Sequence, residues 1–338
     1  MKKIIVTGGA GFIGSHTVVE LVNAGYEPVI IDDFRNSRES ALQGIESILG
    51  RSVSCHRADC NDAEAMDEVF RNEAPIYGVI HFAADKAVGE SVSDPLKYYG
   101  NNIGSLVVLL RVMKAHKVND LVFSSSCTVY GQPDHSPVTE ESPDKNANSP
   151  YGTTKVLCEQ ILQDHKIAEP DLKVTILRYF NPIGAHPSAH IGELPLGVPT
   201  NLVPYITQTA AGIRNELTVY GGDYNTSDGS CIRDYIHVVD LAKAHVQAFS
   251  FMERESAPLA EIFNLGTGNG TSVLEVVKIF EEVSGESLKY TVGPRRPGDI
   301  EQIWAEPSKA NNDLGWKCEL SMKDALADAW RWQQKLVE

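Results

Sequence analysis

The sequence predicts an α/β fold in which a doubly wound parallel Rossmann sheet is followed by a smaller C-terminal substrate domain. Over residues 1–180, short apolar stretches alternate with stretches of helical periodicity. A glycine-rich turn separates the first apolar stretch from the first helical one. The stretches interpreted as strands are apolar throughout, which is typical of parallel strands covered by helices on both faces.

The individual elements follow in chain order. Strands are predicted at residues 3–7, 27–31, 52–58, 76–84, 121–125, 174–179 and 262–265. Helices are predicted after the glycine turn and at residues 105–115, 202–212, 239–252, 273–283 and 322–336. Residues 182–200 are rich in proline and glycine, which predicts a long functional loop. We therefore expect a NAD-binding domain at residues 1–180 and a substrate-binding domain at 181–338, with segment 235–265 returning to the first.

The glycine-rich turn predicts a dinucleotide site. It satisfies G-x-G-x-x-G between a strand and a helix, and Asp32 stands 18 residues past Gly14. Glycines let the backbone approach a pyrophosphate at the helix N-terminus. Asp32 is expected to accept hydrogen bonds from the adenosine ribose hydroxyls and to repel a 2′-phosphate, which favours NAD over NADP. Arg35 and Arg38 keep NADP open as an alternative.

Ser126, Tyr151 and Lys155 form a second candidate site. Tyr151 and Lys155 are four residues apart, so they share one face of a helix. An ammonium near the phenol favours the phenolate, so the pKa of Tyr151 is expected to fall from about 10. Such a tyrosine can act as general base or acid on a hydroxyl, and Ser126 could bind the same substrate oxygen. Taken alone, the three residues have structural explanations, because YxxxK is common in helices and strand-end serines often cap turns.

Polar or small residues stand where several predicted strands end. Asp32, Asp59, Ala84, Ser126 and Asn181 all lie at or just past such ends. In an open parallel sheet, ligands bind along the edge formed by the carboxyl ends of the strands. The convergence of these five positions favours a functional interpretation of the second candidate site.

Composition and charge exclude some classes of function. The net charge of −15 disfavours nucleic acid as a partner, because a phosphate backbone needs a basic face. No apolar run reaches the roughly 18–20 residues that a membrane span needs. The chain begins without the apolar stretch of a signal peptide. The six cysteines show no CxxC pair, which indicates free thiols and a cytoplasmic location.

Metal binding is not expected. His56, Asp59 and Cys60 could be imagined as ligands, but no second ligand pair stands nearby at zinc-like spacing. An anionic substrate would need local cations, for which Arg233 and Arg295 are candidates. Their alternative role is that of solvated surface charges.

At this point the chain resembles the extended short-chain dehydrogenase/reductase family. The segments that carry the likeness are TGGAGFIGSH, SSSCTVYG, YGTTK, RYFNPIGAHPS, NLVPYI, RDYIHVVDLA, FNLGTGNG and RRPGD. Within the family, the chain is similar to the epimerases that interconvert UDP-glucose and UDP-galactose in galactose metabolism. The resemblance implies a cytoplasmic homodimer with tightly held NAD.

The residues and the resemblance together assign two sets of contacts. The NAD contacts are Gly8, Gly11, Phe12, Ile13, Gly14, Asp32, Asp33, Asn36, Ser37, Asp59, Cys60, Phe82, Ala83, Ala84, Lys86, Asn101, Ser126, Tyr151, Lys155 and Phe180. The nucleotide-sugar contacts are Lys86, Ser126, Tyr151, Asn181, Asn201, Leu202, Tyr220, Arg233, Tyr235, Arg295, Asp299 and Ile303. Two positions depart from the family's pattern. Cys127 stands where alanine is common, and Ile303 where tyrosine or cysteine is common, which puts the range of sugars in doubt.

The resemblance implies oxidation and re-reduction at the sugar C4, with Tyr151 as base, Lys155 lowering its pKa and Ser126 relaying the proton. Arg233 and Arg295 would clamp the pyrophosphate. The alternatives are an epimerase of UDP-N-acetylglucosamine, a 4,6-dehydratase and a non-enzymatic NAD sensor. A dehydratase of this kind has Asp-Glu after the strand-end threonine, and no carboxylate follows Thr128 directly here. A sensor commonly lacks the tyrosine or the lysine, and both are present.

Overall fold

The computed structural model describes residues 1–143, 147–255, 259–296 and 298–337, and its centre is a seven-stranded parallel sheet. The strand order is β11-β6-β5-β4-β1-β2-β3. The bounds are β1 Lys3–Thr7, β2 Glu27–Asp32, β3 Ser54–Arg57, β4 Gly78–His81, β5 Asp120–Ser126, β6 Lys173–Tyr179 and β11 Ala260–Leu265. The order reverses direction between β1 and β4, which is where such sheets bind ligands. The predicted fold class is confirmed.

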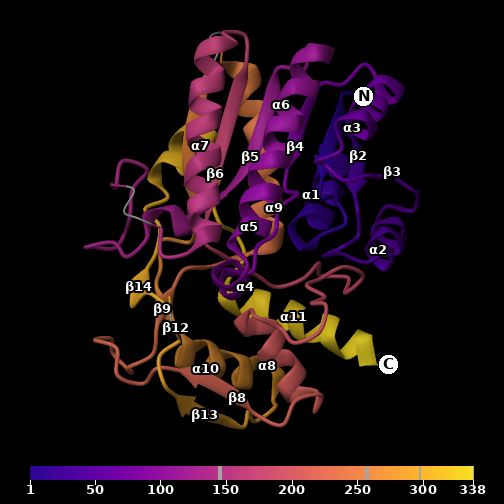
Figure 1. Cartoon of the computed structure of the whole chain (residues 1–338). Coiled ribbons are helices and arrows are strands. Elements are labelled where there is room, and N and C mark those ends of the chain that lie inside the picture. Colours follow the sequence, from indigo (N-terminus) through magenta and orange to yellow (C-terminus); the bar gives the residue numbers. More distant parts are fainter. Residues whose placement is uncertain (144–146, 256–258, 297, 338) are drawn as a thin grey trace.

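Helices cover both faces of the sheet (Figure 1). One apolar cluster joins the sheet to α1 (Phe12–Asn23), α2 (Ser40–Leu49) and α9 (Val238–Arg254). The other joins it to α3 (Ala63–Glu73), α6 (Gly104–His116) and α7 (Pro150–Ala168). Between β4 and α6 lie two short helices, α4 (Val88–Ser93) and α5 (Pro95–Tyr98), and a π-helical turn, η1 (Tyr99–Ile103). Burial on both faces explains why most of the strands are continuously apolar.

The remaining elements gather beside the carboxyl edge of the sheet, where α8, α10, α11, β8 and β13 lie together in Figure 1. The helices are α8 (Leu202–Ala210), α10 (Val273–Ser284) and α11 (Met322–Val337). Short strands pair as β7 (Asn181–Ile183) with β10 (Tyr235–His237), and β8 (Leu217–Tyr220) with β13 (Tyr290–Gly293). A three-stranded sheet joins β12 (Thr271–Ser272), β9 (Ile232–Arg233) and β14 (Gln302–Ile303). Short 3-10 and π-helical turns occupy Cys127–Tyr130 (η2) and Ala310–Leu314 (η3).

Two details of the predicted strands are wrong. β3 is shorter than residues 52–58, and its sequence, Ser-Cys-His-Arg, is partly exposed rather than apolar throughout. As the edge strand it is paired on one side alone, so continuous burial is not required. β4 is also shorter than residues 76–84, because the chain leaves the sheet after His81 to form the loop that contains Lys86.

The division at residue 180 stays a prediction. Two facts bear on segment 235–265: β11 pairs with β6 in the large sheet, and α9 packs on α1. Among the described residues, no helix combines the length and apolarity that crossing a bilayer demands.

Candidate active site

The turn between β1 and α1 is built for close backbone contact. Gly8 has φ +69°, in the left-handed region that favours glycine. A Cβ atom at Gly14 would lie 2.3 Å from the carbonyl oxygen of Gly8, so the helix start packs directly on the turn. The residue before α1, Gly11, makes no side-chain cap, which leaves backbone N–H groups of the first turn for another acceptor. These features fit a dinucleotide whose pyrophosphate lies at the start of α1 beside Phe12.

Asp32, at the end of β2, organises the loop beside this turn. Its carboxylate accepts hydrogen bonds from the backbone N–H groups of Ala10 and Phe34, both at 2.9 Å. It also accepts one from the hydroxyl of Ser37 at 2.8 Å. The carboxylate is thereby held at the strand end, where it would repel a 2′-phosphate.

Arg35 left NADP as an alternative cofactor in the sequence analysis. In the structure, its side chain contacts residues that are themselves predicted to bind the cofactor. Its Nε lies 2.9 Å from the Asp33 carboxylate, and its Nη2 donates to Asn101 Oδ1 at 2.6 Å. The same Nη2 lies 3.8 Å from Asp59, which is followed by the buried Cys60. The guanidinium therefore joins the ends of β2 and β3 to η1 instead of standing free for a phosphate.

The loop after β4 completes the cofactor side of the site. A Cβ atom at Gly8 would lie 2.9 Å from the Ala83 backbone nitrogen, so this loop lies against the glycine turn. Phe82 donates its backbone N–H to the Thr7 carbonyl at 3.1 Å. The residues predicted after β1, β2 and β4 are thus neighbours at one edge of the sheet.

Helix α7 starts where it presents Tyr151 and Lys155 to the end of β5. Ser149 is the N-cap, and its hydroxyl accepts the N–H of Gly152 at 3.2 Å. Pro150 takes the first helical position, where its missing N–H costs nothing. The tyrosine and the lysine therefore lie in the first two turns of the helix.

Burial controls the ionisation of both side chains. Lys155 Nζ donates to the backbone oxygen of Ser124 at 2.7 Å and lies 5.9 Å from the Tyr151 ring centroid. Burial lowers the pKa of Lys155 to about 8. Burial also raises the pKa of Tyr151 above its ordinary value of 10, and Tyr179 adds to the rise. The predicted fall in the Tyr151 pKa is wrong for the chain by itself, because desolvation of the phenol dominates.

Ser126 lies beside the phenol. A hydrogen bond between Ser126 and Tyr151 opposes the rise in the tyrosine pKa. The Ser126 hydroxyl also accepts the hydroxyl of Thr128 at 3.0 Å and its N–H at 3.2 Å. Burial raises the pKa of the neighbouring Cys127 thiol to about 12, so this thiol is neutral at physiological pH.

Arginines gather on the predicted nucleotide side. Arg233 on β9 donates to the backbone oxygen of Ile300 at 2.7 Å. Arg295 lies 2.7 Å from the Asp223 carboxylate. A third arginine, Arg296, contacts Asp299 at 2.8 Å and lies 5.7 Å from the ring centroid of Tyr220. Pro297, in the Arg-Arg-Pro-Gly-Asp motif, lies outside the described residues.

Asn181 and Asn201 stand at the starts of elements on this side. Asn181 begins β7 and donates its backbone N–H to the Asp234 carbonyl at 2.9 Å. Asn201 precedes α8, which begins at Leu202, and its amide donates to Glu193 Oε1 at 2.6 Å. Both side chains belong to residues exposed to solvent.

Three further predicted contacts are buried among apolar side chains. Tyr235 belongs to an apolar cluster with Ile183 and Val203, and it is 6% exposed. Ile303 is 1% exposed and packs in a cluster that includes Phe180, itself 2% exposed. Their roles as ligand contacts stay predictions.

Sequence reasoning missed two carboxylates that lie beside predicted site residues. Glu193 lies 3.3 Å from Lys86 Nζ, which is distant in sequence, and accepts the amide of Asn201, eight residues further along the chain. Glu159 accepts the hydroxyl of Ser125. Its position four residues after Lys155 on one helix was a usable signal, whereas nothing in the sequence pointed to Glu193.

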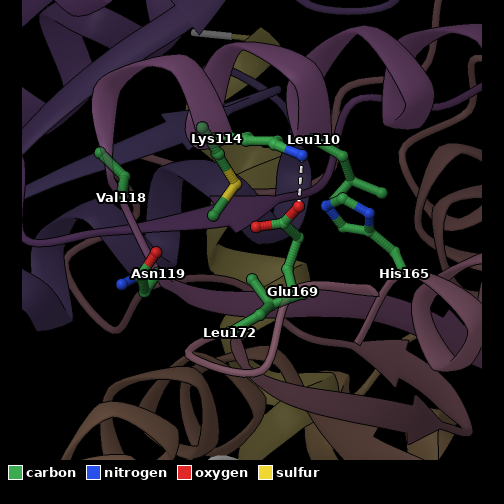
Figure 2. Close-up of a pocket in the computed structure, with 8 residues that line it drawn as sticks. Leu110, Lys114, Val118, Asn119, His165, Glu169 and Leu172 are labelled. Carbon is green, nitrogen blue, oxygen red and sulfur yellow. Dashed lines mark ion pairs between the residues drawn. The ribbon is translucent and has the colours of Figure 1, made fainter. Parts of the chain in front are cut away.

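Other parts of the described structure hold no metal-binding cluster and include a small cavity. No three His, Cys, Asp or Glu side chains gather there in a way that could hold a metal ion. Figure 2 shows a cavity of about 20 Å³ between the ends of α6 and α7, bridged by Lys114 and Glu169. Its lining residues Asn119 and Leu172 precede β5 and β6, so it lies at the opposite edge of the sheet. It has room for about one water molecule.

The parallel sheet and the glycine turn are those of an enzyme of the extended short-chain dehydrogenase/reductase class. A family model described as GDP-mannose 4,6 dehydratase matches residues 5–329. A UDP-glucose 4-epimerase of Bacillus subtilis is 51% identical to this chain, over 99% of the chain and 97% of the relative. One of Yersinia pestis is 49% identical, over 98% and 97%. The chain therefore belongs to the UDP-glucose 4-epimerase family.

A solved structure adds the ligands of a relative. The UDP-glucose 4-epimerase from Bifidobacterium longum, in complex with NAD+ and UDP, matches with a TM-score of 0.95 at 48% identity. The match covers 99% of this chain and 98% of that one. The likeness therefore extends over both the sheet and the C-terminal elements.

Proposed function

We propose that this chain interconverts UDP-glucose and UDP-galactose, as a NAD-dependent isomerase that acts at the sugar C4 in galactose metabolism. The observation that carries the proposal is the placement of Ser126, Tyr151 and Lys155 at the end of β5, in a chain of this family. The glycine turn and Asp32 supply the cofactor side. When bound, NAD would supply the hydride acceptor for C4 in its oxidised form and the hydride donor in its reduced form, and the positive charge of the oxidised form would favour the phenolate.

The chain's own residues handle the proton. Tyr151 takes the proton of the sugar 4-hydroxyl and later returns one to the same oxygen. Ser126 shares a hydrogen bond with the phenol and holds the substrate oxygen beside it. The Lys155 ammonium stabilises the phenolate and binds the cofactor ribose. Desolvation of these three side chains excludes water from the reacting oxygen. The exclusion of water strengthens each of their interactions with it.

The nucleotide is bound apart from the reacting carbon. Arg233 and Arg295 hold the pyrophosphate, and Asn181 and Asn201 bind its oxygens or the sugar. Because most binding energy then comes from UDP, the pocket can hold the sugar with either face toward the cofactor. This freedom is what an epimerase requires.

A 4,6-dehydratase is the second candidate, because the matching family model carries that description. Elimination of water needs an additional acid–base pair near the sugar. The turn after Ser126 holds Cys127 and Thr128 instead, and the Cys127 thiol is neutral. An epimerase of UDP-N-acetylglucosamine remains the alternative within the same chemistry.

We also propose a homodimer, a cytoplasmic location and two domains, with residues 1–180 and segment 235–265 holding NAD and residues 181–338 supplying the sugar-nucleotide contacts. The family likeness and the pairing of β11 with β6 support these proposals.

The test is a product analysis. The purified protein is incubated with UDP-galactose, and the products and the bound nucleotide are identified by chromatography after denaturation. We expect UDP-glucose as product and NAD released from the protein. A 4-keto-6-deoxy product would establish a dehydratase, and absence of conversion by NAD-loaded protein would refute the proposal. Preferential binding of NADP would refute the role given to Asp32.

A further inference from the structure

Behind the candidate active site lies a buried ion pair that the proposed chemistry does not use. Glu159 lies one helical turn after Lys155 on α7, and Arg178 lies on β6. Their side chains are 7% and 4% exposed. Arg178 Nη2 lies 2.6 Å from Glu159 Oε2 and its Nε 3.1 Å from Oε1, so the contact is bidentate.

The pair reaches the end of β5 through Ser125. The Ser125 hydroxyl donates to Glu159 Oε1, and Ser125 is the register partner of Arg178 on the neighbouring strand. Lys155 donates to the carbonyl oxygen of the preceding residue, Ser124, at 2.7 Å. Two α7 side chains one turn apart thus hold the two β5 residues that come directly before Ser126.

Arg178 is also connected to β11 by hydrogen bonds. Arg178 Nη1 donates to the Tyr130 hydroxyl at 3.0 Å, which donates to Asn264 Oδ1 at 2.7 Å. The N–H of Asn264 donates to the Glu140 carboxylate at 2.7 Å. The ends of β5, β6 and β11 are therefore tied to α7 by one polar network.

Stability alone gives little reason for such a pair. Apolar residues of similar volume are often as stabilising as a buried ion pair, because desolvating the charges offsets their attraction. Its place directly behind Ser126 and Lys155 points instead to the geometry and charge of the site.

The negative charge of the Glu159 carboxylate affects the ionisation of Lys155. The titratable groups that face Lys155 are Tyr151, Cys158 and Glu159 on α7 and His81 on β4. Burial raises the pKa values of Tyr151 and Cys158 and lowers that of His81 to about 3, so these three are neutral at pH 7. The Glu159 carboxylate is thus the negative charge that favours the ammonium of Lys155.

We infer that Glu159, anchored by Arg178 and bound by Ser125, is a positioning residue for the reaction. It fixes α7 against the end of β5, so that Lys155 and Tyr151 meet Ser126, and its charge keeps Lys155 cationic. The inference rests on the proposed function.

Three variants separate the two effects. Ser125→Ala removes one hydrogen bond and leaves the ion pair intact. Glu159→Gln removes the charge and keeps the shape, whereas Glu159→Asp keeps the charge and alters the reach. Val276→Ala, in the apolar cluster around α10, is the control for a loss of stability outside the network of Glu159, Arg178 and Ser125.

The measurements are kcat and KM for UDP-galactose, the pH–rate profile, Tm and bound NAD. We expect Ser125→Ala to lower kcat about tenfold with KM within about twofold, since a small misplacement of reacting groups is costly. Glu159→Gln should move the alkaline limb of the profile to lower pH, because Lys155 then loses its proton more readily. Glu159→Asp should leave that limb in place while lowering kcat. Val276→Ala should lower Tm alone.

The wild-type protein is assayed first, so that a failure of the proposed function can be distinguished from a failure of the positioning role of Glu159. An inactive, NAD-loaded wild type would refute the proposed function. With an active wild type, the inference is overturned if Ser125→Ala keeps wild-type kcat, or if Glu159→Gln changes Tm without moving the pH profile. Should Glu159→Gln not fold, Ser125→Ala decides the outcome.

Discussion

Gly14→Ala tests the glycine turn as the cofactor cradle. The added Cβ would lie 2.3 Å from the Gly8 carbonyl oxygen and 2.8 Å from the Gly9 Cα, whereas ordinary contacts begin near 3.4 Å. Both neighbours are backbone, so α1 or the turn must move by roughly 1 Å, at a cost of about 1–3 kcal/mol. At about 2–4 °C for each kcal/mol, Tm should fall by roughly 2–12 °C.

Cofactor binding should fall as well, because the displaced backbone is the part that approaches the pyrophosphate. The assay is thermal unfolding at fixed added NAD, together with the NAD content of the purified protein. The matched control is Gly89→Ala on α4, where an added Cβ would meet nothing within 4 Å. The control should keep its NAD and its Tm. Wild-type Tm and NAD content in Gly14→Ala would refute the reasoning.

Three further predictions concern the chemistry and the substrate. Tyr151→Phe should keep its fold and bound nucleotide and lose about 10²- to 10⁴-fold in turnover of UDP-galactose, since the proton-transferring oxygen is gone; retention of more than about half the turnover would exclude Tyr151 as the base. Lys155→Met should lose activity and move the acidic limb of the pH–rate profile to higher pH, because the phenolate loses its cationic neighbour, whereas an unmoved limb would contradict that role. Ile303 is predicted to restrict the space for the acetamide of UDP-N-acetylglucosamine, so Ile303→Ser should raise activity on that substrate by about 5- to 150-fold and leave UDP-galactose turnover nearly unchanged. Equal wild-type efficiency on plain and acetylated sugars would exclude this role of Ile303.

Local patterns predicted much of the fold. The switch from a short apolar run to helical periodicity across Gly8–Gly14 located β1, the turn and α1, because each depends on residues close in sequence. The spacing of Tyr151 and Lys155 placed them on one face of a helix, which is α7, although the N-cap of that helix at Ser149 was not predicted. The short strands β7 to β10 and β12 to β14 were not found, since two to four residues give too little periodicity.

Along the chain, then, the sequence by itself determined the α/β alternation, the cofactor turn and the three side chains proposed for proton transfer. Tertiary structure alone decided how those side chains ionise. Burial raises the pKa of Tyr151 and lowers that of Lys155, although their spacing suggested a mutual effect. The tertiary structure also placed Glu159 in contact with Ser125 and Arg178. The reason is physical: helix and strand periodicity act between near neighbours, whereas desolvation and ion pairing depend on which distant residues the fold brings together.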